Sequence, residues 1–150
     1  MNFTIKQFNK KMIYQLPSAY FCGVRLHSLN QQVCKTSVKF KWINKNPFKS
    51  IYFAVLAMSA ELSTAMFVLK YTAESNVDFS TLILGVNAQF LKKATGKIYF
   101  ICDEGDGVQN YVKQAITTKE GVPFTLKSIG VNSEGEEVAK FEFQWSIKTK

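Results

Sequence analysis

Histidine, cysteine and arginine are scarce in this chain, and this scarcity removes several kinds of active site. His27 is the only histidine, so a catalytic triad that depends on histidine has little to build on. Cys22, Cys34 and Cys102 are widely spaced and form no CxxC pair, which is not the ligand spacing of a zinc site. We therefore expect no metal centre, and we interpret the thiols as small core residues of a reduced, cytosolic protein.

The chain also lacks the signatures of nucleotide binding, calcium binding and secretion. Neither a Walker sequence nor GxGxxG occurs. The acidic segment from Asp103 to Gly107 has neither the spacing nor the closing Glu of an EF-hand, so we interpret it as a turn before a helix. Residues 1–15 place Lys6, Lys10 and Lys11 among spaced apolar residues instead of one continuous apolar run. We therefore predict a cytoplasmic protein.

Basic residues outnumber acidic ones, 19 to 11, which gives a formal net charge of +8. Arg25 is the only arginine, so the chain offers few of the bidentate groups that read bases. It also has no RNP-like or zinc-finger pattern, and we expect no nucleic-acid partner. Two interpretations of the lysine excess remain open: a basic surface without a specific partner, and a site for a polyanionic ligand such as coenzyme A.

One long apolar run, from Ile51 to Leu69, contains Glu61 as its only ionisable side chain. We predict a helix that begins at Ser50 as its N-cap and ends near Lys70. A helix apolar on all sides must be buried on all sides, so this one should form the centre of the fold. A lone membrane span would expose Glu61 to lipid at a cost of about 2.5–3.5 kcal/mol. We therefore expect no membrane partner, and a largely buried Glu61 that is paired, protonated or functional.

The composition, 47% hydrophobic and 14% aromatic, predicts that residues 1–150 fold as one globular domain. Apolar spacing predicts an amphipathic helix over residues 1–16, closed by Pro17, and another from about Gly107. Alternation predicts six strands, at 21–29, 33–42, 77–91, 97–103, 122–131 and 137–148, and the third should present Leu82, Leu84, Val86, Ala88 and Phe90 on one face. This pattern indicates an α+β fold in which an antiparallel sheet wraps around the long helix.

The order of these elements and the segment from Asn46 to Glu61 resemble the hotdog fold of acyl-CoA thioesterases. In the phenylacetate-degradation type, Asn is followed six residues later by His-Gly-Gly, and Asp follows nine residues after that His. The same spacings fall here on Asn46, Tyr52-Phe53-Ala54 and Glu61. The segment also looks like a less characterised hotdog group, in which an aromatic pair replaces His-Gly and Glu replaces Asp. Residues 90–96 match the place where hotdog proteins turn between strands near the coenzyme.

The resemblance implies an enzyme that hydrolyses an acyl-CoA or similar thioester. Glu61 would act as general base or nucleophile, and the backbone N–H groups of Phe53 and Ala54 would form an oxyanion site. Tyr52 would hydrogen-bond the substrate carbonyl, and Asn46 would orient the loop or Glu61. Each of these residues also has a structural interpretation: Glu61 as a structural acid, Tyr52 as a packed aromatic and Asn46 as a turn residue.

The resemblance further implies that Lys92 and Lys93 neutralise the phosphates of coenzyme A, although lysines are also common in exposed turns. It implies a homodimer, with a tetramer as an open alternative, and no cofactor beyond the thioester that serves as substrate. His-Gly-Gly is replaced here by Tyr52, Phe53 and Ala54. This replacement leaves a second function open, that of a non-catalytic protein that binds acyl groups or coenzyme A.

Overall fold

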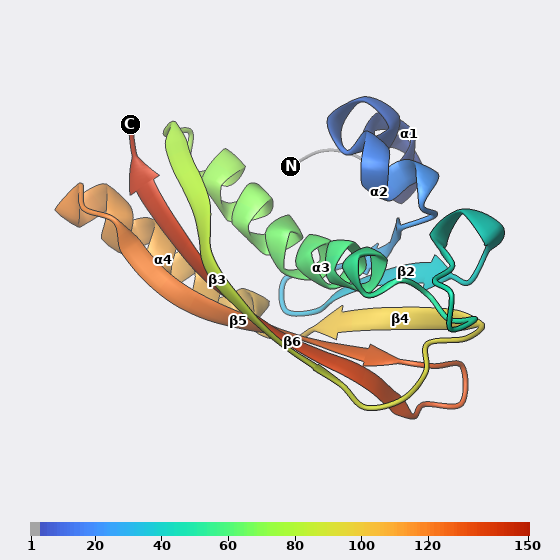
Figure 1. The fold of residues 1–150 in the computed structure, drawn as a ribbon. Coiled ribbons are helices and arrows are strands. Elements are labelled where there is room, and N and C mark those ends of the chain that lie inside the picture. Colours follow the sequence, from blue (N-terminus) through green and yellow to red (C-terminus); the bar gives the residue numbers. More distant parts are fainter. Residues whose placement is uncertain (1–3) are drawn as a thin grey trace.

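The computed structural model describes residues 4–150, and its main layer is one six-stranded antiparallel sheet (Figure 1). The strands follow the order β1-β2-β4-β5-β6-β3 across the sheet. Their bounds are β1 (Arg25–Leu29), β2 (Cys34–Lys39), β3 (Phe79–Phe90), β4 (Lys97–Cys102), β5 (Val122–Val131) and β6 (Glu137–Thr149). The helices are α1 (Ile5–Gln15), α2 (Pro17–Phe21), the 3-10 helix η1 (Trp42–Asn44), α3 (Phe53–Glu74) and α4 (Gly105–Thr118). The predicted α+β class and the six antiparallel strands are confirmed.

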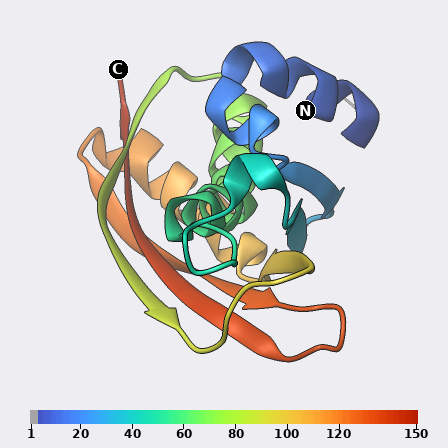
Figure 2. The same ribbon diagram turned by 45° about the vertical axis from the view of Figure 1, so that its right-hand side comes forward.

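Helix α3 lies against the concave side of the curved sheet and forms the centre of the core (Figure 2). Ala60, Met66 and Phe67 are fully buried on it, and they belong to the same cluster as Phe141 and Ile147 of β6. By length and composition alone this helix would be apolar enough to cross a membrane. Its burial against the sheet shows that it is a core helix, as the apolar run predicts.

The start of α3 corrects one detail of the sequence analysis. Its N-cap is Tyr52, which makes no side-chain capping hydrogen bond, and Ser50 is not the cap. Ser50 is buried, and its side chain and backbone N–H both hydrogen-bond to Asn46. Ser50 does not cap α3, although serine favours N-cap positions, because its hydroxyl makes hydrogen bonds within the preceding loop instead.

Strand β3 lies at one edge of the sheet and carries a bulge between Ile83 and Gly85. Before the bulge, Leu82 pairs with Ser146, while after it Val86 pairs with the buried Phe143. Directly paired residues place their side chains on the same face of a sheet. The prediction that Leu82 shares a face with Val86, Ala88 and Phe90 is therefore wrong, since the extra residue reverses the alternation.

The N-terminal segment covers one side of α3 (Figure 1). Helix α1 confirms the predicted amphipathic helix, although Phe3, at its expected start, lies outside the described residues. Asn9 anchors α1 to β1, because its amide group donates to the Leu26 carbonyl and accepts from the Leu26 N–H. Pro17 does more than close this helix: it begins α2, which ends at Phe21, where the first strand was predicted to start. Proline suits the first position of a helix because its fixed φ is already helical.

Candidate functional site

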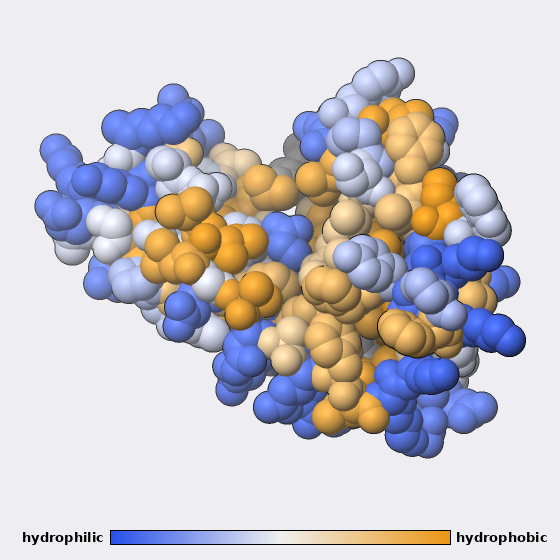
Figure 3. Space-filling view, viewed as in Figure 1, coloured by the Kyte–Doolittle hydropathy of each residue, from blue (hydrophilic) through white to orange (hydrophobic). Residues whose placement is uncertain are grey.

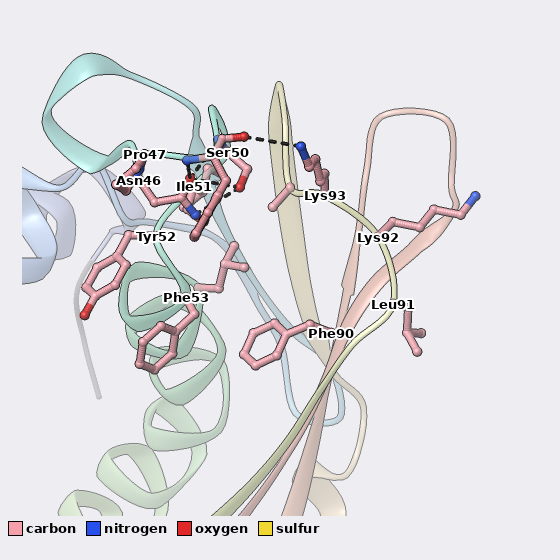
Figure 4. A pocket seen from close by; sticks show the side chains of 13 residues that line it. Asn46, Pro47, Ser50, Ile51, Tyr52, Phe53, Phe90, Leu91, Lys92 and Lys93 are labelled. Carbon is pink, nitrogen blue, oxygen red and sulfur yellow. Dashed lines mark hydrogen bonds between the residues drawn. The ribbon is translucent and has the colours of Figure 1, made fainter.

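A cavity of about 670 Å³ opens beside the N-terminus of α3 (Figure 4). Its walls come from the loop before α3, from the first turn of α3 and from the end of β3 with the turn that follows. This volume falls within the range of small-molecule sites, about 300–1,000 Å³. The lining residues include Asn46, Pro47, Phe48, Ser50, Ile51, Tyr52, Phe53, Leu56, Phe90, Leu91, Lys92, Lys93 and Ala94. The structure thus brings together Asn46, Tyr52, Phe53, Lys92 and Lys93 of the predicted site.

Three aromatic rings form the apolar wall of this cavity. The ring of Phe53 meets Tyr52 edge to face at 4.9 Å between centroids, and it meets Phe90 at 6.2 Å in the same manner. All three rings remain about half exposed. Phe90 was predicted both as a strand residue and as the start of the segment that turns near the coenzyme, but not as part of an aromatic wall with Tyr52 and Phe53.

The amide of Asn46 organises the loop that leads into α3. Its Oδ1 accepts hydrogen bonds from the backbone N–H groups of Phe48 and Ser50, at 3.0 and 3.1 Å. Its Nδ2 donates to the Ser50 hydroxyl at 3.0 Å. Both ends of the Asn46 amide are therefore occupied by its own loop, which favours an orienting role over direct contact with a substrate.

The backbone at the start of α3 offers free hydrogen-bond donors. The first N–H groups of a helix have no partner within the helix. Among the described residues, the N–H groups of Phe53 and Ala54 make no hydrogen bond, whereas that of Val55 bonds to the Tyr52 carbonyl. Two unpaired donors at the positive end of a helix can stabilise a developing oxyanion. Ala54 is not among the residues that line the cavity.

The two lysines at the far side of the cavity differ in their contacts. The ammonium of Lys93 donates to the Phe48 carbonyl at 3.4 Å, on the cavity rim. The ammonium of Lys92 points away from the cavity (Figure 4) and pairs with Glu136 at 2.6 Å. This hydrogen bond lowers the pKa of Glu136. Lys93 is therefore the better placed of the two to meet a ligand phosphate.

Glu61 lies in a second, smaller cavity of about 240 Å³, between α3 and the N-terminal helices. It is partly buried, and its carboxylate makes no hydrogen bond or ion pair with any residue in 4–150. The other walls are Gln15, Leu16, Pro17, Ser18, Ala19 and Met58. Burial raises the pKa of Glu61 to about 7. A carboxyl group with that pKa can exchange protons at neutral pH, as a general base must.

The two cavities are separated along the helix. Tyr52 and Glu61 are nine positions apart, a rise of about 13 Å at 1.5 Å per residue. One chain therefore does not bring Glu61 to the oxyanion donors or to Asn46.

The sequence did not predict that the N-terminal helices cover Glu61. The Leu16-Pro17 junction could have indicated it, because a proline after an amphipathic helix also suits the start of a second one.

The remaining candidates have structural roles. Cys34 and Cys102 face each other across β2 and β4, fully buried, and burial raises the pKa of both thiols. Such thiols are poor nucleophiles. His27 is exposed and meets the Tyr99 ring edge to face. Within residues 4–150, no three His, Cys, Asp or Glu side chains are grouped to hold a metal ion. Helix α4 begins at Gly105, so Asp103 and Glu104 precede the helix as predicted, whereas Asp106 and Gly107 lie in its first turn.

Comparison with known proteins identifies a family and a fold. The model of a family described as a domain of unknown function, DUF4442, matches residues 6–147. Curated proteins include no match to this chain. A solved protein of unknown function from Pseudomonas aeruginosa, described as a probable thioesterase, is 16% identical with a TM-score of 0.82. The match covers 100% of this chain and 99% of that one.

Two further solved relatives are described as thioesterases. One, from Haemophilus influenzae, is 13% identical with a TM-score of 0.69, over 99% of this chain and 93% of that one. The other, from Staphylococcus aureus, was solved as two variants, 13% and 12% identical, with TM-scores of 0.63 and 0.61. These matches cover 91% and 89% of this chain and 100% and 98% of those. At such identities the likeness shows the fold, and it confirms the expected hotdog fold of the thioesterase superfamily.

The Staphylococcus aureus variants carry informative substitutions. One replaces a glutamate with alanine and the other replaces a glutamine with alanine, at positions fifteen residues apart. Asn46 and Glu61 have the same separation in this chain.

Proposed function

This chain belongs to the DUF4442 family, and on that premise we propose that it is a thioesterase that hydrolyses an acyl-CoA or similar thioester. The position of Glu61 on the core helix is the observation that supports the proposal most strongly. A carboxylate on an apolar core helix, open to a cavity and without a hydrogen-bond partner in residues 4–150, contributes nothing to packing that an apolar residue would not. Its pKa of about 7 suits a general base at neutral pH.

The proposed reaction needs one base and one oxyanion site. Glu61 takes a proton from water, and the water oxygen forms a bond to the thioester carbonyl carbon. The carbonyl oxygen becomes an oxyanion, which the N–H groups of Phe53 and Ala54 stabilise. Collapse of this intermediate breaks the C–S bond, and the departing thiolate receives the proton held by Glu61. The products are a carboxylic acid and a free thiol, so no external reductant or oxidant is needed.

A second copy of the chain would complete this site. Since Tyr52 and Glu61 lie about 13 Å apart on one helix, one carbonyl cannot contact both groups. In the hotdog superfamily that the chain resembles, the helix N-terminus of one subunit faces the acidic residue of the other. Strand β3 suits such pairing: it is an unpaired edge of the sheet, and its side chains Leu82, Leu84 and Val86 are all more than half exposed. Pairing two such edges satisfies their backbone groups and covers the apolar side chains.

Light scattering tests this assembly. We expect a dimer at micromolar concentration, and a monomer when Leu82 and Val86 are both replaced by Lys. Ile116→Lys is the control because Ile116 is also exposed but lies on α4, which packs on α3, β5 and β6 and is not part of the sheet edge. A wild-type chain that is strictly monomeric would contradict both the dimer and the shared site.

The second candidate function is a protein that binds acyl groups or coenzyme A without turnover. One observation favours it: the Phe53 ring is exposed at the cavity, where the family motif has glycine and open space. A panel of acyl-CoA thioesters of increasing chain length separates the two functions. Release of free thiol from any of them supports the thioesterase. Saturable binding of coenzyme A, measured by calorimetry, with no thiol release from any thioester would favour the binding protein.

A further inference from the structure

The loop between β2 and α3 exposes large apolar side chains at one end of the molecule. Trp42 is 79% exposed, Phe48 72% and Ile43 51%. In Figure 3, hydrophobic and strongly hydrophilic surface lie side by side at this end, over the loop seen at the right of Figure 1. Three such residues within one short loop differ from the single apolar residues that any surface carries. We call Trp42, Ile43 and Phe48, with the lysines described below, the loop patch.

The loop is held in place by two asparagines, so the exposure of these side chains is built into the fold. Asn44 is buried; its Nδ2 donates to the carbonyls of Cys22 and Lys39, each at 2.9 Å. Its Oδ1 accepts from the Lys41 N–H at 2.8 Å. Asn46 fixes the second half of the loop through Phe48 and Ser50, as described above. Trp42 and Phe48 are therefore presented on an ordered backbone.

Lysines flank these apolar side chains along the loop, and the loop itself contains no acidic residue. Lys39, Lys41, Lys45 and Lys49 are all exposed. Glu61 is the first acidic residue of the whole chain, so residues 1–60 carry nine basic residues and no acidic one. Residues 61–150 carry ten basic and eleven acidic residues. The net charge of the protein thus resides in the part of the chain that contains the loop patch, an asymmetry typical of proteins that meet a polyanionic surface.

We propose that the loop patch docks the protein on an anionic lipid surface. Trp prefers the boundary between headgroups and acyl chains, because its ring is apolar and its N–H is polar. Ile43 and Phe48 can enter the apolar layer, and the lysines remain at the level of the lipid phosphates. Nucleic acid fits less well. The only arginine, Arg25, donates to the Tyr20 and Val24 carbonyls and lies over the Tyr20 ring, so it is not available to bases.

The docking is peripheral, and it departs from the expectation that no membrane is a partner. Helix α3 stays in the core, so nothing spans the bilayer. The loop patch is continuous with the larger cavity, because Phe48 belongs to both and neighbouring Pro47 also lines the cavity. A docked protein would hold the cavity opening beside the lipid, where long acyl groups concentrate. The proposal does not depend on catalysis.

Vesicle co-sedimentation with the full chain tests this inference. We expect binding to vesicles of phosphatidylcholine with phosphatidylglycerol, release at high salt, and little binding to phosphatidylcholine alone. Tryptophan fluorescence gives a second measurement: Trp145 is buried, so a blue shift on binding reports Trp42. The double variant Lys41→Gln/Lys45→Gln should bind about 30-fold more weakly, from about fivefold per lysine. Trp42→Ser/Phe48→Ser should lose binding even at low salt.

The control variant is Lys113→Gln/Lys148→Gln, which removes the same charge at the opposite end of the molecule, where α4 and the C-terminus lie (Figure 1). We expect this control to bind vesicles like the wild type. An equal loss in the control would overturn the proposal, because attraction would then be a property of net charge. The absence of vesicle binding, together with patch-dependent binding of a single-stranded oligonucleotide or patch-dependent self-association, would also overturn it.

Discussion

The indole N–H of Trp145, in β6, donates a hydrogen bond to Oγ1 of Thr64, in α3, over 3.2 Å. The same hydroxyl donates to the backbone carbonyl of Glu61 at 2.9 Å. This chain of contacts ties the sheet to the helical turn that carries the candidate base. Replacement of Thr64 by Val keeps the shape but leaves a buried indole N–H unpaired.

Thr64→Val should therefore lower the free energy of unfolding by about 1–3 kcal/mol. Urea denaturation measures this loss. Thr117→Val is the matched control, because Thr117 also donates to a carbonyl of its own helix but is exposed on α4. It should change stability by less than about 0.5 kcal/mol. Equal effects of the two substitutions would mean that the Trp145 contact contributes nothing.

Two glycines of α4 should respond to alanine in opposite directions. A Cβ at Gly105 would collide with the Gln31 carbonyl oxygen and the Phe67 ring, whereas a Cβ at Gly107 would meet open space. Gly105→Ala should cost about 1–3 kcal/mol or more through overpacking. Gly107→Ala should stabilise by about 0.5–1 kcal/mol, because alanine loses less backbone entropy in a helix. Thermal denaturation of both variants checks the contrast, and stabilisation by Gly105→Ala would contradict the close helix–core contact.

The ionisation of Glu61 should make stability depend on pH. Its pKa is raised to about 7 in the folded chain, from 4.5, so between these values the folded state binds the extra proton. Stability from this group is therefore complete below about pH 4.5 and falls as pH rises toward 7, by at most about 1.4 kcal/mol per unit. Glu61→Gln should remove this slope in urea titrations between pH 4.5 and 7. A Gln variant with the wild-type slope would show that Glu61 titrates normally.

The two lysines at the cavity should contribute unequally to coenzyme A binding. Lys93→Gln should weaken binding roughly tenfold, the effect of losing about 1.5 kcal/mol from a hydrogen bond to a charged group. Lys92→Gln is the matched control and should have a smaller effect, because Glu136 already pairs with Lys92. Calorimetry at fixed salt measures both dissociation constants. A larger loss at Lys92 would place the phosphates on the other side of the turn.

Much of the fold could be predicted because its elements follow simple periodicities. The alternation of Ala139, Phe141, Phe143, Trp145 and Ile147 placed β6 within one residue of its observed end. The apolar run of α3 indicated a core helix for the same reason. The errors came from competing local interactions. Ser50 bonds to Asn46 instead of capping α3, and the bulge before Gly85 turns Leu82 away from Val86. An isolated glycine within a strand is a signal of such a bulge.

The candidate site was less predictable, because it depends on contacts between distant segments. The motif spacing identified Glu61, but the cover of Leu16 and Pro17 over it arises only when α1 and α2 fold back on α3. Likewise, the ion pair between Lys92 and Glu136 joins residues that are 44 positions apart in the sequence. No local pattern contains such pairings. The unequal roles of Lys92 and Lys93 therefore became visible only in the structure.

The central claim is that Glu61 is the general base of a thioesterase, and the rate of thioester hydrolysis by Glu61→Gln tests it most directly. Gln keeps the size of the side chain but cannot accept a proton from water, so kcat/KM should fall by about 10²–10⁴-fold. The exposed Glu120→Gln serves as the control and should hydrolyse thioesters like the wild type. Wild-type kcat/KM should also rise with pH through about 7, as Glu61 ionises. A Gln variant that retained wild-type activity would make Glu61 a structural acid and contradict the account.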